Sequence, residues 1–190
     1  PNASSACELV TELMQELCEP ADILPFEADA VLSGIVLDTK NFTIRTGDRT
    51  FDAAAFLRRS GADTTRVKKL FQNGMEETME RYDIMKQARI YKGIAVVAAQ
   101  ETQNRIVAAQ AADELLNISG VNASAVLYPT GDGGVAVSAR SIGDVNVQVL
   151  LESLGGGGNR SAAGAQIANC SLRDAVNKLF AAIDEYRATE

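Results

Sequence analysis

Four consecutive glycines are followed at once by three polar side chains. These residues are Gly155, Gly156, Gly157, Gly158, Asn159, Arg160 and Ser161. A backbone without side chains adopts positive φ at little cost and approaches a ligand closely. The segment therefore predicts a site for a phosphate-bearing ligand. The alternative is a flexible linker, which glycine-rich runs also form. We favour the binding site because segments predicted to be ordered lie on both sides of the run.

A second candidate for anion binding lies at the end of a predicted strand. Arg140 and Ser141 end this strand, and Gly143 and Asn146 follow just before the next helix. Arginine binds phosphate bidentately. A lone arginine at a strand end is more often simply solvated. Its combination with the glycine run predicts instead a pocket in which both segments contact an anion.

A carboxylate, Asp38, follows the apolar run Ile35-Val36-Leu37. A carboxylate beside core residues either caps a neighbouring turn or coordinates a cation. Without further evidence, we favour the capping role for Asp38. The sequence contains no histidine. Catalysis by histidine, a Ser-His-Asp triad and a histidine-ligated metal are therefore excluded within this chain. A catalytic metal would depend on carboxylates of this chain or on ligands from sequence outside it.

The composition is that of a soluble globular protein of one or two domains, with 46% apolar and 23% charged residues among 190. A net charge of −7 argues against duplex nucleic acid as a partner but allows a small phosphate ligand. No apolar run is long enough to span a membrane, so we expect no membrane contact within this chain and a cytoplasmic location. The chain begins without an initiator methionine, which indicates a fragment or a processed product.

The elements that must position these residues divide the chain in two. Residues 1–73 are predicted to be nearly all helix, beginning with a capping box in which Ser5 precedes Glu8. The first helix carries on one face the apolar residues Leu9, Val10, Leu13, Met14 and Leu17. A charged linker helix is predicted over residues 74–88.

Residues 89–190 alternate between strands and helices. Strands are predicted at 94–99, 125–128 and 135–138, and helices at 103–116, 146–154 and 171–186. This order predicts an α/β domain with a mixed sheet. The glycine run is expected to be a loop between the last two helices.

Several segments taken together resemble the DHH phosphoesterase superfamily. They are residues 34–42, 45–47, 50–54, 139–141 and 146–147 with the glycine run. They are most similar to the catalytic module of GdpP-type cyclic di-AMP phosphodiesterases. The resemblance covers essentially the whole chain in order. The glycine run alone would be a loose match, whereas its combination with the Asp38 and Arg140 segments is specific.

The resemblance implies a two-domain, metal-dependent phosphodiesterase. Residues 1–73 would be the mostly helical C-terminal part of the DHH domain, and 89–190 the α/β DHH-associated, substrate-binding domain. The family binds two divalent metals, usually manganese, and a metal-bound hydroxide opens cyclic di-AMP to the linear dinucleotide. Asp38 matches a metal ligand. The matching substrate-binding positions are Arg140, Ser141, Asn146, Gly155, Gly156, Gly157, Gly158 and Asn159, and no residue is assigned as catalytic.

Two departures from the family pattern limit this expectation. The family usually places histidine where this chain has Asn159, which can hydrogen-bond but carries no positive charge. The motifs His-x-Asp-x-Asp and Asp-His-His are absent, so most metal ligands are missing and we expect binding without hydrolysis. Apolar surface exposed on the incomplete domain is expected to favour a homodimer.

Other functions remain open from the residues alone. One is a DHH enzyme that degrades short oligoribonucleotides or dephosphorylates a nucleoside bisphosphate. Another is a noncatalytic nucleotide-binding module. A Rossmann dinucleotide domain is disfavoured because the glycines follow a helix and their spacing is not Gly-x-Gly-x-x-Gly.

Overall fold

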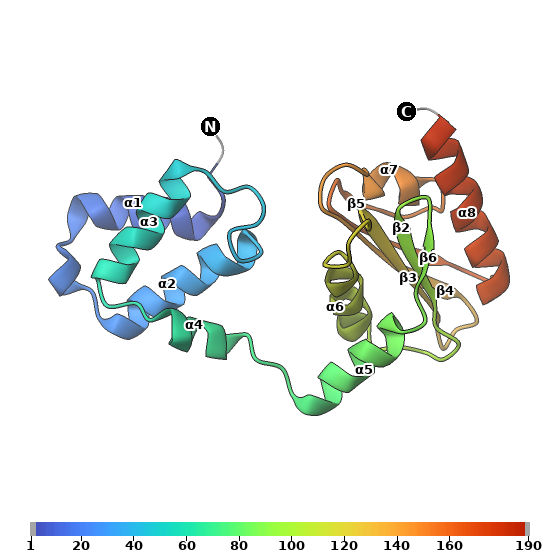
Figure 1. Ribbon diagram of the computed structural model, residues 1–190, viewed down its shortest axis with the longest axis horizontal. Coiled ribbons are helices and arrows are strands. Elements are labelled where there is room, and N and C mark those ends of the chain that lie inside the picture. Colours follow the sequence, from blue (N-terminus) through green and yellow to red (C-terminus); the bar gives the residue numbers. More distant parts are fainter. Residues whose placement is uncertain (1–2, 189–190) are drawn as a thin grey trace. The chain divides into compact units, whose positions relative to one another are not determined.

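The computed structural model describes residues 3–188, and the chain folds into two compact units that divide between Asn73 and Gly74 (Figure 1). The first unit is helical, as the sequence predicts. Its helices are α1 (Ala6–Leu17), α2 (Pro25–Asp38), α3 (Asp48–Arg59) and α4 (Thr64–Leu70), with a 3-10 turn at Pro20–Asp22. The predicted cap is present, because the side chain of Ser5 accepts a hydrogen bond from the Glu8 amide at 3.0 Å.

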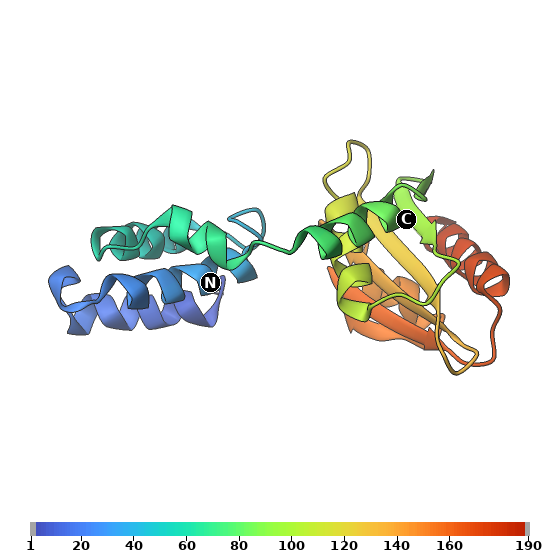
Figure 2. The same ribbon diagram turned by 90° about the horizontal axis from the view of Figure 1, so that it is seen from below.

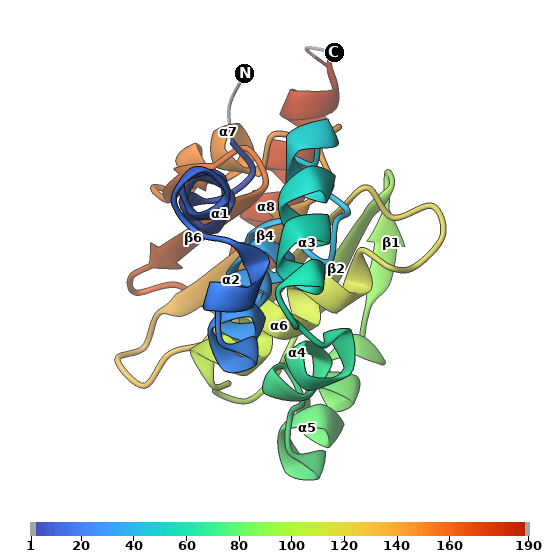
Figure 3. The same cartoon turned by 90° about the vertical axis from the view of Figure 1, so that its left-hand side faces the viewer.

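The core of the first unit lies between α2, α3 and α4, around Leu32, Ile35 and Leu57. Figure 3 looks along α1, with α3 running past it. The leucines that the sequence places on one face of α1 are exposed: Leu9 at 48%, Leu13 at 62% and Leu17 at 80%. The residues of α1 that are buried are polar, Glu8 and Thr11. The side of α1 that packs also carries Cys7 and Met14, so Met14 of the predicted apolar face reaches the core whereas the leucines do not.

Glu8 is a buried carboxylate that links the start of the chain to α3. It is 2% exposed, and its Oε2 accepts hydrogen bonds from the Ser4 amide at 3.2 Å, the Ser4 hydroxyl at 2.5 Å and the Thr50 hydroxyl at 2.6 Å. Burial opposes ionisation of Glu8, but these hydrogen bonds and the nearby charge of Arg49 hold its pKa below the usual range.

Glu8 should therefore make the first unit sensitive to acid. A pKa that is lower in the folded state gives a stabilisation that is complete above the unfolded pKa of about 4.3 and is lost as the pH falls through the folded pKa. We expect Glu8→Gln to lower the free energy of unfolding by about 1–2 kcal/mol at neutral pH. Urea denaturation followed by circular dichroism, at neutral pH and at about pH 3, measures this.

The matched control is Glu16→Gln, because Glu16 is an exposed carboxylate on the same helix. It should leave the stability unchanged at both pH values. A stability deficit of Glu8→Gln that is equally large in acid would contradict the role given to the ionised carboxylate.

The second unit is built on a six-stranded sheet with the order β1-β2-β3-β4-β6-β5. The strands are β1 (Arg89–Tyr91), β2 (Ile94–Ala98), β3 (Ala123–Pro129), β4 (Val135–Ser141), β5 (Gly157–Asn159) and β6 (Ala162–Ile167). Strands β2 and β3 are parallel, and every other adjacent pair is antiparallel. The mixed sheet predicted from the sequence is confirmed.

Helices cover both faces of this sheet, as Figures 1 and 2 show. On one face α6 (Arg105–Leu115) packs on β3 and β4, around Val97, Val126 and Leu115. On the other face lie α7 (Val147–Glu152) and α8 (Leu172–Ala188), around Leu127 and Leu179. Successive residues of a strand face opposite sides, so each strand contributes to both cores. No helix within residues 3–188 is long and apolar enough to cross a bilayer.

The helix expected as a separate linker, α5 (Met75–Met85), is part of the second unit. It packs on α6, where Ile84 enters the core. Arg81, 5% exposed, hydrogen-bonds Gln110 at 2.9 Å and pairs with Glu114 at 3.2 Å. These contacts fix α5 to the sheet domain rather than leaving it as a spacer.

The glycine run is not the loop that the sequence predicts. Gly157, Gly158 and Asn159 form strand β5, which pairs with β6 at the edge of the sheet. Neither strand is predicted from the sequence, because their glycines and alanines lack the alternation of apolar and polar side chains that marks a half-buried strand. The run is therefore one arm of a β-hairpin.

Candidate functional site

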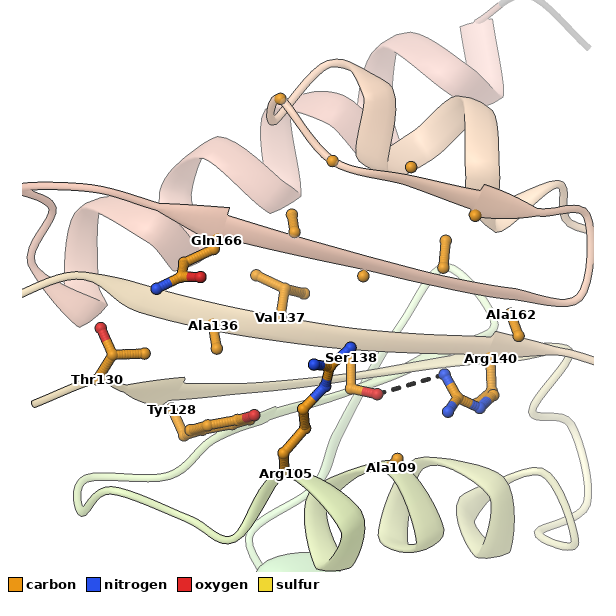
Figure 4. A pocket seen from close by; sticks show the side chains of 17 residues that line it. Arg105, Ala109, Tyr128, Thr130, Ala136, Val137, Ser138, Arg140, Ala162 and Gln166 are labelled. Atoms are coloured by element: carbon orange, nitrogen blue, oxygen red, sulfur yellow. Dashed lines mark hydrogen bonds between the residues drawn. The ribbon is translucent and has the colours of Figure 1, made fainter.

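A cavity of about 740 Å³ lies on the α6 side of the sheet, where α6 leaves the last strands uncovered. We call it the glycine groove, and Figure 4 shows its side chains. It is lined by Arg105, Ala109, Tyr128, Thr130, Ala136, Val137, Ser138, Arg140, Gly155, Gly156, Gly157, Gly158, Ala162, Ala163, Gly164, Ala165 and Gln166. Its size is typical of a small-molecule site.

The floor of the groove carries almost no side chains. Pairing places Gly157 opposite Gly164, and Gly164 opposite Ser138. Residues that pair across an antiparallel sheet face the same side, so these small residues form one continuous surface. Such a surface lets a planar ring lie flat on the sheet and brings backbone atoms close to a ligand.

The glycines of the run have different roles. A Cβ on Gly156 would lie 2.4 Å from the carbonyl oxygen of Gly164, and one on Gly158 would lie 2.3 Å from that of Ala162. Both glycines are therefore required for the hairpin itself. A Cβ on Gly157 would meet no atom within 4 Å. Gly157 is thus open to a ligand, and its lack of a side chain helps to keep the floor flat.

Arg140 is held firmly at one end of the groove. Its Nε lies 3.2 Å from Oδ2 of Asp113 on α6, and its Nη1 donates to the carbonyl oxygen of Ala139 at 2.9 Å and to the Ser138 hydroxyl at 3.3 Å (Figure 4). The carboxylate of Asp113 compensates much of the arginine charge. The structure brings Arg140 and Gly155–Gly158 together, as the sequence predicts.

Three other predicted site residues do not line the groove. Ser141 is 2% exposed on the opposite face of β4, and its hydroxyl accepts from the Gly143 amide at 3.0 Å. Asn146 caps α7 by accepting from the Gln148 amide at 3.1 Å. Each of these side chains therefore has a structural role.

Asn159 also has a structural role. Its side-chain oxygen accepts hydrogen bonds from the amides of Ser161 and Ala162, each at 3.0 Å. These bonds close the turn between β5 and β6. Asn159 therefore shapes the hairpin, and its carbonyl is engaged there.

Sequence reasoning missed the groove residues Arg105, Tyr128 and Ser138. Ser138 and Arg140 are two residues apart on a strand, so the alternation of β4 places them on one face and Ser141 on the other. That signal was available in the sequence. Arg105 comes from the start of α6 and Tyr128 from β3, and only the fold brings them together.

Asp38, the predicted metal ligand, lies in the first unit at the exposed end of α2. It lines a shallow pocket with Arg45 and Arg49; Arg45 donates to the Asp38 carbonyl oxygen at 2.9 Å, and Arg49 pairs with Glu12 at 2.6 Å. Within residues 3–188, no three His, Cys, Asp or Glu side chains gather as a metal-binding group. One carboxylate beside two guanidinium groups does not fit a two-manganese centre by itself.

Comparison with known protein families and proteins gives concordant matches. The DHHA1 domain model matches residues 91–189. The chain is 47% identical over 189 residues to the cyclic-di-AMP phosphodiesterase GdpP of Geobacillus thermodenitrificans, and 43% identical to the cyclic-di-AMP phosphodiesterase PdeA of Listeria monocytogenes. Each match covers 98% of this chain and 29% of the relative. The chain therefore spans less than a third of the length of these relatives.

A solved structure shares the fold. It is an exopolyphosphatase-related protein from Bacteroides fragilis, with a TM-score of 0.85 and 21% sequence identity. The match covers 98% of this chain and 58% of that protein. At this identity the likeness concerns the fold alone.

Proposed function

Because this chain belongs to the DHHA1 domain family, we propose that it binds cyclic di-AMP as the substrate-binding portion of a metal-dependent phosphodiesterase. That enzyme would open the cyclic dinucleotide to its linear form. The observation that carries the proposal is the glycine groove, where a floor of glycine and other small residues lies beside Arg140. Relatives 43–47% identical that carry the name cyclic-di-AMP phosphodiesterase support the choice of ligand.

The groove has the features that a cyclic dinucleotide needs. Cyclic di-AMP has two flat purine rings, each carried by a ribose, and the two riboses are joined by phosphodiester groups. The ligand therefore requires an open surface for a ring and donors for the phosphate oxygens. Gly157 and Gly164 supply the surface, and the guanidinium groups of Arg105 and Arg140 supply donors from two walls. The hydroxyl of Ser138 lies on the same face of the sheet.

Hydrolysis would need metal ligands beyond those of this chain. Two manganese ions are the cofactor that the family resemblance implies, and they would activate a water molecule as nucleophile. Asp38 would be the single ligand supplied here. We therefore propose that the chain alone binds the nucleotide without cleaving it, and that hydrolysis belongs to a longer protein with further carboxylate or histidine ligands.

Isothermal titration calorimetry and a cleavage assay with manganese test this proposal together. We expect the chain to bind cyclic di-AMP and to release no linear dinucleotide in chromatography, because the described residues do not form a metal centre. Manganese-dependent cleavage by the chain would contradict the proposed division of roles. Failure to bind any cyclic or linear dinucleotide would overturn the function itself.

A further inference from the structure

The glycine groove contains a second arginine, Arg105, whose charge is not compensated. Arg105 is the first residue of α6, an eleven-residue helix with no acidic side chain in its first turn. A cation at this position is disfavoured by the helix dipole, whose N-terminal end is itself positive. Within residues 3–188, the Arg105 guanidinium forms no ion pair with a carboxylate. The positive charge of Arg105 is therefore available to an anionic ligand in the groove.

Tyr128 supplies an unpartnered polar group at the same place. Its side chain is 5% exposed and lines the groove from β3. No residue of the described chain hydrogen-bonds its hydroxyl, which points along the groove toward Arg105 (Figure 4). Burial raises the pKa of Tyr128 and the Arg105 charge only partly offsets this, so the hydroxyl is a proton donor at neutral pH. The hydroxyl oxygen is not among the buried side-chain atoms that lack a partner, so it is accessible from the groove and free to donate to a ligand.

The two arginines of the groove are therefore not equivalent. Asp113 compensates the charge of Arg140 at 3.2 Å. A second carboxylate, Asp132, lies in the turn after β3. It is held there by hydrogen bonds from the Thr130 hydroxyl and from the Gly134 amide, the latter at 3.4 Å. Arg105 thus has the charge available for an anion, whereas Arg140 is fixed for directional hydrogen bonding.

We propose that Arg105 and Tyr128 form the phosphate-binding end of the glycine groove. A phosphate oxygen of the dinucleotide accepts hydrogen bonds from the Arg105 guanidinium and the Tyr128 hydroxyl, at the positive end of α6. Arg140 then orients the ligand at the other end. The inference rests on the proposed function and adds to it the Tyr128 hydroxyl as a donor and the different roles of the two arginines.

The test is the affinity of the full chain for cyclic di-AMP as a function of salt. Removing a phosphate-binding arginine makes the slope of log affinity against log salt less steep, because one attractive charge pair that salt screens is lost. We expect Arg105→Gln to weaken binding by about tenfold or more with this loss of slope. Tyr128→Phe should weaken binding by about fivefold with the slope unchanged, because a neutral donor is lost. Arg173→Gln, an exposed arginine on α8, is the matched control and should change neither quantity.

A second measurement needs no ligand. The phenol of Tyr128 is isolated in an ultraviolet titration by subtracting the curve of Tyr128→Phe from that of the unaltered chain. Arg105→Gln should raise the Tyr128 pKa, because it removes the charge that lowers it. Circular dichroism confirms that each variant is folded.

The outcomes separate this inference from the proposed function. Unchanged affinity and slope in Arg105→Gln, with normal binding by the unaltered chain, would overturn the inference alone. An unchanged Tyr128 pKa in that variant would also overturn it. If the unaltered chain binds no dinucleotide, the proposed function fails and the inference fails with it.

Discussion

Gly157→Val should abolish cyclic di-AMP binding, with a loss of affinity of about 100-fold or more, while the chain stays folded. A Cβ at this position meets no atom within 4 Å, so the fold has room for the side chain. Gly157 has no positive φ, and β-branched residues suit a strand. The valine methyl groups would instead occupy the floor of the glycine groove. Calorimetry gives the affinity and thermal denaturation gives the stability.

Gly131→Val is the control for this prediction. Gly131 has no positive φ, and a Cβ there would also meet no atom within 4 Å, but it lies in the turn after β3 and does not line the groove. This variant should bind cyclic di-AMP as the unaltered chain does. Full binding by Gly157→Val would mean that the ligand does not lie on this floor.

Gly158→Ala should do the opposite and damage the fold. Gly158 has a φ of +154°, and a Cβ there would lie 2.3 Å from the carbonyl oxygen of Ala162 and 2.5 Å from the Cα of Ala163. These are backbone atoms of the paired strand, so the clash is relieved only by separating β5 from β6. We expect a loss of about 2–3 kcal/mol in the free energy of unfolding.

Amide hydrogen exchange over residues 157–167 measures this effect locally. Gly158→Ala should remove protection in both strands, whereas Gly157→Ala should leave it within about 0.5 kcal/mol of the unaltered chain. Equal protection in the two variants would contradict the separation of a structural glycine from a ligand-facing one. The adjacent positions make the pair a matched comparison.

Much of the fold follows from local sequence signals. The Ser5 cap, the helices α6 and α8 and the strands β2, β3 and β4 are predicted because caps, turns and apolar periodicity agree at each of them. The hairpin of β5 and β6 is not predicted, because a strand of glycine and alanine gives no alternation to detect. The exposed leucine stripe of α1 shows a second limit, since an apolar face does not reveal which side of a helix is covered in a given unit.

The candidate site is also predicted only in part, because local sequence signals do not show which side chains the fold brings to one face. Arg140 and the glycine run are chemically conspicuous, and the fold brings them together. Ser141 is chemically suitable but faces the other side of the sheet, because adjacent strand residues point in opposite directions. Arg105 and Tyr128 come from separate elements, and their partnership depends on the packing of α6 against β3.

The most direct test of the glycine groove as the nucleotide site is a backbone amide NMR titration of the full chain with cyclic di-AMP. We expect the largest shifts at residues that surround the groove floor, namely Arg105, Ser138, Gly157 and Gly164. Amides of the first unit around Asp38 should change little. Shifts concentrated in that pocket, or no shifts at saturating nucleotide, would contradict binding in the groove.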